Sequence, residues 1–173
     1  MKDLNDLFQD TIRDIYNSEH QLLKAMAGMR EKSENDQLKR AFDTHIEQTE
    51  EQIRRIEQIC IRLNFQPTGK TCQGTLGIVR EATEDIGQFA GSPAGDACII
   101  ACAQKAEHYE MANYGSAIAW AEELEMDDDI IDLLEQTLQE EEEADDLLTS
   151  IAEDMANVQA NDTMRTAGRA TVF

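Results

Sequence analysis

Proline and glycine are scarce in this sequence, with 2 Pro and 9 Gly among 173 residues. Both interrupt helices, whereas the abundant Ala, Leu, Glu and Gln lose little side-chain rotamer freedom in a helix. A chain of this length can bury a core without disulfides. We therefore expect one all-α domain.

Basic residues and long apolar runs are also lacking. The chain has 15 Lys and Arg against 36 Asp and Glu, a formal net charge of −21, which argues against a nucleic-acid surface or an anionic membrane as partner. No apolar run approaches the ~20 residues of a spanning helix, and the N-terminus MKDLNDLFQD has no apolar signal-peptide core. We expect a cytoplasmic protein that binds neither nucleic acid nor membrane.

The four cysteines, Cys60, Cys72, Cys98 and Cys102, show no CxxC spacing. Cys98 and Cys102 stand one helical turn apart, which could suit a soft metal, but small buried thiols are the commoner explanation. We interpret all four as packing residues.

Apolar residues recur at steps of three and four over four long stretches, which predicts helices over about residues 3–30, 36–63, 96–124 and 128–157. Ser33, Asn35 and Asp36 are candidate caps for the second helix. These four helices predict a four-helix bundle over residues 1–157. Residues 158–173 lack periodicity, and we expect them to form a flexible C-terminal extension.

The connector over residues 64–95 has a different character. The segments NFQPTGKTCQG and GSPAGD enclose a short amphipathic helix that carries Leu76, Val79, Ile86 and Phe89. Such a connector is far longer than a bundle hairpin needs. It suits a crossover that runs the length of the bundle.

Polar residues interrupt the apolar row of each bundle helix. They are Glu19 in the first, His45 and Thr49 in the second, Glu107 and Glu110 in the third, and Glu141 and Asp145 in the fourth. Because each carboxylate continues an apolar row in both directions, it should point inward. Each also lies near the middle of its helix, so antiparallel packing should bring the acids into one layer.

Five carboxylates in one apolar layer would repel one another, and each ionised group loses several kcal/mol on leaving water. No Lys or Arg stands in these apolar rows. The layer can become neutral through protonation or through bound cations. Cations explain it better, because carboxylates at i,i+3 or i,i+4 share a helix face and can bind one metal or two adjacent metals.

The sequence thus predicts a di-metal centre with Glu19, His45, Glu107, Glu110, Glu141 and Asp145 as ligands. Oxygen ligands with one imidazole suit two Fe or Mn ions per chain, and zinc stays an alternative. Tyr114, one turn beyond Glu110, is either a redox-active phenol or a core aromatic with a satisfied hydroxyl.

An inward Glu on each of two helices, with paired ligands on the others, is the pattern of ferritin-like carboxylate bundles. More narrowly, the sequence resembles the YciE/YciF family of bacterial ferritin-like proteins in its segments YNSEHQLLKAM, AFDTHIEQTEEQIRRIEQI, ACAQKAEHYEMANYG and LLEQTLQEEEEADDLL. The resemblance covers about residues 3–155. It implies a rubrerythrin-like bundle, often dimeric, that is linked to stress responses and binds metal, with no settled activity.

The second helix departs from the usual ferritin-like pattern, in which it carries Glu-x-x-His. Here it offers Glu47-x-x-Glu50, and these glutamates lie off the apolar row or at its margin. We therefore prefer His45 as the ligand from this helix.

Two functions fit these features. The first is a metalloprotein in which ions bridged by Glu110 and Glu141 react with O2 or peroxide, as an oxidase, a peroxidase or a peroxide scavenger. The second is a non-catalytic acidic bundle that binds a partner under stress, with metal serving only to hold the helices. Because the sequence carries nothing that specifies a closed shell, we expect a homodimer rather than a cage.

Overall fold

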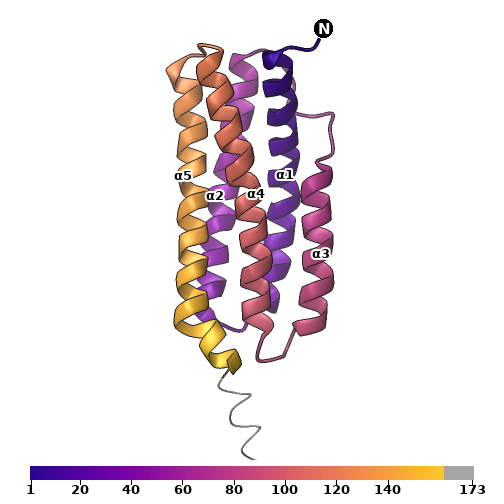
Figure 1. The fold of residues 1–173 in the computed structure, drawn as a ribbon, viewed down its shortest axis with the longest axis vertical. Coiled ribbons are helices and arrows are strands. Elements are labelled where there is room, and N and C mark those ends of the chain that lie inside the picture. The colour runs from indigo at the N-terminus through magenta and orange to yellow at the C-terminus, as the bar shows by residue number, and fades with distance from the viewer. Residues whose placement is uncertain (162–173) are drawn as a thin grey trace, which may run out of the picture.

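The computed structural model describes residues 1–161, which form long helices joined by short loops (Figure 1). The helices are α1 (Leu4–Lys32), α2 (Asp36–Arg62), α3 (Gln73–Phe89), α4 (Gly95–Glu123) and α5 (Asp128–Ile151). A π-helical turn, Ala152–Ala156, follows α5 directly. The all-α fold, its four long helices and the helix within the connector are confirmed.

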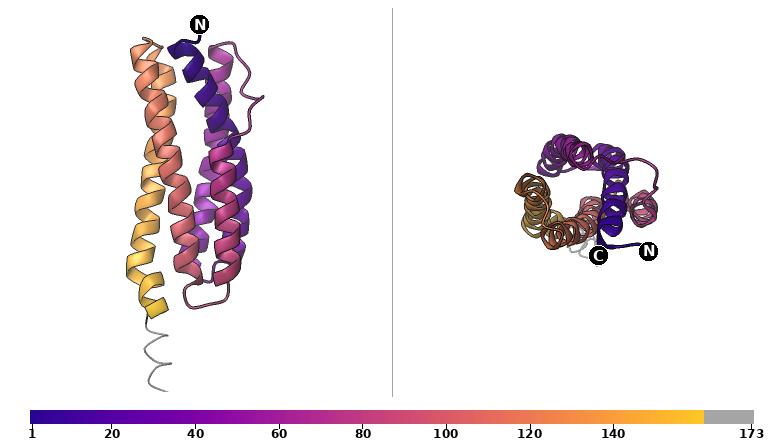
Figure 2. Two further views of the ribbon diagram at one scale, coloured as in Figure 1. Left: turned by 45° about the vertical axis from the view of Figure 1, so that its right-hand side comes forward. Right: turned by 90° about the horizontal axis from the view of Figure 1, so that it is seen from above.

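Four of the helices form the bundle, and α3 lies outside it. Around the bundle axis the order is α1, α2, α5 and α4, while α3 packs against α1 and α4 (Figure 2). The connector returns the chain to the end where α2 began, so α4 runs parallel to α2 (Figure 1). As a result, every bundle helix is antiparallel to both of its neighbours.

Local hydrogen bonds fix the helix starts. Asp3 caps α1 through the backbone N–H of Asp6, and Asn35, one of the three candidate caps, accepts from two N–H groups at the start of α2. The backbone N–H groups of Glu34 and Asn35 also donate to the Asp96 carboxylate, each at 2.9 Å. Asp96 thereby ties the α1–α2 loop to the first turn of α4.

The core consists of two apolar clusters. One contains Met26 and Phe42 with residues from the start of α4 and the end of α5. The other contains Phe8, Ile56 and Tyr114 with residues from the start of α5. In each bundle helix the buried polar residues lie between the segments that contribute to the two clusters, so a polar layer crosses the middle of the bundle.

The connector helix α3 covers the bundle with a narrow face. Of the apolar side chains that made this segment look amphipathic, Ile86 is buried, whereas Leu76 is 39% exposed and Phe89 is 44% exposed. Thr75 and Ala82 complete the buried face of α3. A helix outside the bundle has neighbours on one side only, so the rest of its apolar surface stays uncovered.

Three further sequence expectations meet the structure here. Cys60, Cys72 and Cys102 are buried and Cys98 is half-buried, and none of the four forms a disulfide. Within residues 1–161, each helix is too short or too polar to span a bilayer. Residues 157–161 continue as helix, and the remainder of the expected C-terminal extension lies outside the described residues.

Candidate metal centre

Five of the six predicted ligands are buried in the polar layer. Glu19 and Glu141 are 0% exposed, Glu107 and Glu110 are 3% exposed, and His45 is 7% exposed. They come from all four bundle helices, because each helix carries a polar residue near its midpoint where an apolar one would otherwise stand.

His45 stands between two of these carboxylates. Its Nε2 lies 3.2 Å from Oε2 of Glu107 and 3.3 Å from Oε2 of Glu141. Both contacts are ion pairs when His45 is protonated, and neither oxygen has a hydrogen-bond partner. The three ligand atoms lie within 4.8 Å of one another, a separation that suits a shared cation.

Glu19 and Glu110 are held from their outer sides. The Tyr114 hydroxyl donates to Oε1 of Glu19 at 2.5 Å, and the Ser18 hydroxyl donates to Oε1 of Glu110 at 3.4 Å. The second oxygen of Glu19 is buried with no hydrogen-bond partner. Each carboxylate therefore has a fixed orientation and lone pairs left for another group.

Burial and the charges of neighbouring acids raise the pKa values of Glu19, Glu110 and Glu141. Burial, followed by the charge of Glu141, raises the pKa of Glu19 to about 8. Burial also raises the pKa of Glu141 to about 7. The pKa of Glu110 lies well above its usual value, first through burial and then through the charges of Glu19, Glu141 and Glu107. These effects show that the four carboxylates share one electrostatic environment.

Burial acts on the pKa of His45 in the opposite direction from its effect on the acids. Burial by itself would lower the pKa of this imidazole, but the neighbouring carboxylates of Glu107 and Glu141 outweigh burial and raise the pKa well above 6.5. On the far side of the ring, Nδ1 lies 3.3 Å from Oε1 of Gln48. This contact orients the ring so that Nε2 faces the two carboxylates.

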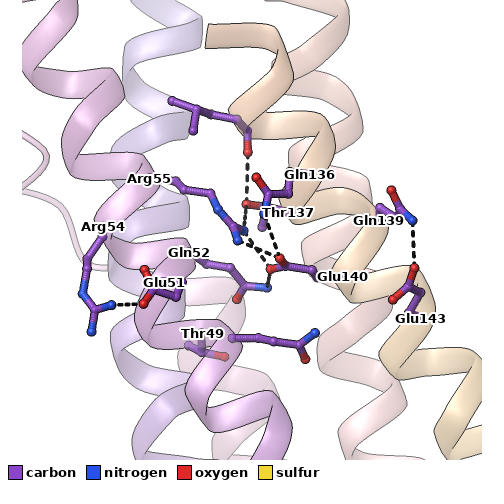
Figure 3. A network of polar contacts seen from close by, with 12 residues as sticks. Thr49, Glu51, Gln52, Arg54, Arg55, Gln136, Thr137, Gln139, Glu140 and Glu143 are labelled. Carbon is purple, nitrogen blue, oxygen red and sulfur yellow. Dashed lines mark hydrogen bonds and ion pairs between the residues drawn. The ribbon is translucent and has the colours of Figure 1, made fainter. Parts of the chain in front are cut away.

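A buried arginine lies beside the layer and was missed by the sequence reasoning. Arg55 forms a bidentate ion pair with Glu140, at 2.6 and 2.7 Å, and donates to the Thr137 hydroxyl at 3.0 Å (Figure 3). The apolar rows contain no Lys or Arg, but a cation from the position next to such a row does reach the interior beside the acids. Arg55 stands one residue before Ile56 in the apolar row, and its long stem lets the guanidinium reach the interior.

Gln52 joins this ion pair to the candidate ligands. Its side-chain amide donates to Oε2 of Glu140 at 3.2 Å (Figure 3). The same amide donates to Oε1 of Glu141 at 2.5 Å. Because Glu140 already balances Arg55, that arginine adds no net positive charge to the layer. Among the described residues, no Lys or Arg forms an ion pair with Glu19, Glu107, Glu110 or Glu141.

The connector helix also reaches the layer. The hydroxyls of Thr75 and Ser18 lie 2.7 Å apart, and Ser18 in turn contacts Glu110. The Cys72 thiol lies 3.3 Å from the Thr75 hydroxyl and 3.1 Å from the Tyr109 hydroxyl. A continuous row of hydroxyl and thiol groups thus runs from the α3–α4 contact to Glu110.

Asp145 is the predicted ligand that the structure does not bring into the layer. Its carboxylate lies 3.1 Å from the side-chain amide of Gln104 and 3.3 Å from Nε2 of His108, which is exposed. The buried row of α5 runs through Thr137, Glu141 and Leu148, so the inward position after Glu141 belongs to Ala144. The apolar repeat predicted the burial of Glu141 correctly, but the next inward position was predicted one residue too far along the helix, at Asp145.

The second helix contributes His45 rather than its glutamates. Glu47 and Glu50 are exposed, and His45 and Thr49 are buried. Thr49 donates its hydroxyl to the backbone carbonyl of His45 at 2.9 Å, which satisfies the hydroxyl within its own helix. The preference for His45 over the glutamate pair agrees with this burial.

The donor set fits a divalent cation. Ligand atoms of His45, Glu107 and Glu141 lie within 4.8 Å of one another, Glu19 and Glu110 are buried in the same layer, and the oxygens Oε2 of Glu19, Glu107 and Glu141 have no hydrogen-bond partner. Buried acceptors of this kind are costly unless something binds them. Oxygen-rich sites with one nitrogen ligand suit Fe or Mn.

Comparison with known proteins agrees with this fold. Residues 3–161 match the family described as a domain of unknown function, DUF892. Protein YciF of Escherichia coli strain K12 is 37% identical over 161 residues, which cover 92% of this chain and 96% of that protein.

Solved structures extend the comparison. The crystal structure of the E. coli stress protein YciF has a TM-score of 0.85 at 37% identity, covering 91% of this chain and 99% of YciF. YcfI of Rhodopseudomonas palustris, which has been proposed to be a structural protein, has a TM-score of 0.84 at 40% identity, covering 87% of this chain and 96% of YcfI. A Xanthomonas campestris protein with 17% identity and a TM-score of 0.71 shares the fold. The resemblance to the YciE/YciF proteins is confirmed, and the chain belongs to the DUF892 family.

Proposed function

We propose that this protein holds two divalent cations, Fe or Mn, in the polar layer and uses them to react with O2 or peroxide under stress. The ligands are Glu19, His45, Glu107, Glu110 and Glu141, with Glu110 and Glu141 as bridges. The observation that carries the proposal is the set of buried carboxylate oxygens that lack any hydrogen-bond partner. A bundle that needed only stability would do better with apolar residues at these positions.

Charge balance supports cations over a purely structural layer. Four carboxylates face one imidazole, while the nearby Arg55 is already paired with Glu140. Ionised acids in such a layer would cost several kcal/mol each, against a total stability of about 5–15 kcal/mol. Two divalent ions would neutralise four carboxylates.

The surrounding residues of the chain keep the ligands in place. The Tyr114 hydroxyl fixes Glu19, and the Gln52 amide fixes Glu141. His45 contacts Glu107 and Glu141 from α2. When bound, a pair of Fe or Mn ions supplies the electrons that reduce O2 or peroxide, and the carboxylates stabilise the higher positive charge that results.

Metal analysis tests this proposal directly. Protein purified without chelator should contain close to two Fe or Mn ions per chain, measured by inductively coupled plasma mass spectrometry. Glu107→Ala and Glu110→Ala should each lose most of this metal, because each removes a ligand from the layer. Glu142→Ala, which removes an exposed acid from α5, is the matched control and should keep it.

Metal content that stays the same in all three variants, or wild-type protein without metal, contradicts the proposal. For loaded protein, anaerobic reduction followed by O2 or peroxide tests for turnover. Consumption of either oxidant above the rate of free metal in solution is expected.

A non-catalytic role is the second candidate. The raised pKa values of Glu19 and Glu141 favour a layer that becomes neutral by binding protons, and one relative, YcfI, has been proposed to be a structural protein. Under this alternative the protein stays folded and equally stable in chelator. Loss of stability on metal removal favours the first candidate.

A further inference from the structure

A cavity of about 230 Å³ lies between α2 and α5 and reaches the candidate ligands. Its lining includes His45 and Glu107 together with the apolar side chains of Phe42, Ala144, Leu147 and Leu148. His45 and Glu107 are nearly buried, whereas Leu147 is 47% exposed. The ligands therefore form the inner end of the cavity, and Leu147 lies at its mouth.

This cavity gives outside molecules access to the layer. Glu19 and Glu141 are 0% exposed and line none of the cavity, whereas His45 and Glu107 keep a small exposed area and line it. A molecule in the cavity would thus meet His45 and Glu107 first. A larger hollow of about 840 Å³ lies at the end of the bundle near Asn35 and Asp96, and no candidate ligand lines it.

The size of the cavity sets the class of molecule. One water takes about 30 Å³ in the liquid, so a volume near 230 Å³ is far larger than hydrogen peroxide or O2 requires. It is also below the roughly 300–1,000 Å³ of pockets that enclose drug-sized ligands. A compact organic molecule with a small apolar body matches this size.

The lining sets its polarity. Phe42, Leu147 and Leu148 offer apolar contact along the wall, and the polar groups lie at the inner end and the rim. Glu143 at the rim and a chain charge of −21 disfavour an anion such as a fatty acid. At the inner end, the Glu107 carboxylate and the His45 ring are the polar groups of the lining, and a carboxylate can accept a hydrogen bond from an O–H group.

We infer that the cavity between α2 and α5 binds a small neutral organic hydroperoxide, with its O–O–H group at His45 and Glu107 and its apolar body against Phe42, Leu147 and Leu148. The choice of a hydroperoxide rests on the proposed function, whereas the apolar body and the O–H head follow from the cavity. Reduction breaks the O–O bond with two electrons and two protons and yields the alcohol and water. Two divalent Fe or Mn ions, held as proposed above, would supply one electron each, and solvent would supply the protons.

Binding of the product alcohol tests the cavity without any turnover. The probe is 2-phenyl-2-propanol, the alcohol that corresponds to cumene hydroperoxide, titrated into the full chain as purified and followed by two-dimensional NMR. Saturable shifts should cluster on residues of α2 and α5 around His45 and Leu147. Absence of saturable binding, or shifts centred elsewhere, overturns the inference.

Two variants sharpen the measurement. Leu147→Gln removes apolar surface at the mouth and should weaken binding about tenfold, and Leu7→Gln is its control because Leu7 on α1 is equally exposed, at 46%. Ala144→Phe should fill the cavity and abolish binding, with Ala119→Phe at an exposed site of α4 as control. Equal affinity in Leu147→Gln and Leu7→Gln overturns the inference even if the wild type binds the probe.

The binding measurement and the metal analysis can fail separately. Alcohol binding at the cavity in a protein without metal would refute the proposed function and leave the binding site standing. In metal-loaded protein supplied with excess one-electron reductant to return the ions to the divalent state, Leu147→Gln should raise KM for cumene hydroperoxide and leave hydrogen peroxide consumption unchanged, because only the organic substrate contacts the mouth. A reaction with both peroxides that Leu147→Gln slows equally counts against a cavity-bound substrate.

Discussion

At the scale of single residues, the hydrogen bond between Tyr114 and Glu19 shows how the layer is held. Both side chains are 0% exposed, and the phenol donates a hydrogen bond to one oxygen of this carboxylate, while the second oxygen has no hydrogen-bond partner. Burial and the charge of Glu19 raise the pKa of Tyr114 well above 10, so the phenol stays protonated and can donate. Its first role is therefore to orient a ligand.

Tyr114→Phe should lower the free energy of unfolding of metal-free protein by about 1–3 kcal/mol, because it leaves a buried acceptor without its donor. Tyr16→Phe is the matched control, since the Tyr16 hydroxyl donates to Glu57 near the surface. Its effect should stay within about 0.5 kcal/mol. Urea unfolding measures both, and equal losses would contradict this account of the Tyr114 bond.

The Arg55–Glu140 pair makes a second prediction at this scale. Arg55→Met should destabilise the protein by about 3–5 kcal/mol, because it leaves Glu140 without a counter-ion in a mostly buried position. Arg54→Met removes a neighbouring arginine whose ion pairs with Glu50 and Glu51 are exposed, and it should change stability by no more than about 1 kcal/mol. Thermal unfolding distinguishes the two, and similar shifts in Tm would rule out a special role for the buried pair.

At the scale of the helices, the contact between α3 and α4 depends on a glycine. A Cβ on Gly74 would lie 2.5 Å from the Tyr109 hydroxyl and 2.8 Å from its ring, whereas a Cβ on Gly77, one turn along the same helix, would meet nothing within 4 Å. Gly74 thus lets α3 approach α4 closely. This approach places Thr75 against Ser18 beside the layer.

Gly74→Ala should therefore destabilise the protein by about 1–3 kcal/mol through overpacking. Gly77→Ala should stabilise it by about 0.5–1 kcal/mol, since alanine is the better helix residue where there is room. Chemical denaturation gives both values. A stabilising Gly74→Ala would show that α3 does not pack against Tyr109 in solution.

The helical repeat predicted which glutamates are buried but not the orientation of Asp145. The positions of Glu19, Glu107, Glu110 and Glu141 in apolar rows predicted their burial correctly, because the helical repeat decides which residues share a face. Asp145 sat at the edge of such a row, and a shift of one residue on a helix turns a side chain by about 100°. The repeat alone could not decide whether Asp145 or Ala144 faces the layer, because the rotation of α5 depends on where α4 packs against it.

At the scale of the whole molecule, the raised pKa values make stability depend on pH. Glu19 and Glu141 have pKa values of about 8 and about 7 in the folded protein, against about 4.3 for an unperturbed glutamate. Between the unfolded pKa of about 4.3 and these folded pKa values, the folded state binds more protons than the unfolded state. The stability that these groups contribute is therefore complete below the unfolded pKa and is lost as pH rises through 7 and 8.

Metal-free protein should accordingly lose stability between about pH 5, where the exposed acids are already ionised, and about pH 8. Saturating Mn²⁺ or Zn²⁺ should flatten this slope, because the cation replaces the protons. Urea unfolding at several pH values, with chelator or with metal, measures the difference. Parallel pH profiles under the two conditions would argue that metal does not enter the layer.

Other expectations at this scale stay predictions. The homodimer, the cytoplasmic location and the flexible end of the chain rest on composition and on family resemblance. Family membership itself is confirmed over residues 3–161.

The sequence by itself determined the helices, the crossover connector and the identity of most of the buried acids, because helix propensity and the 3.6-residue repeat are local properties. Only the tertiary structure decided that Arg55 enters the interior, that Asp145 turns toward Gln104 and His108, and that a cavity beside His45 opens between α2 and α5. These features depend on how far each helix is rotated about its own axis, and the packing of neighbouring helices sets that rotation.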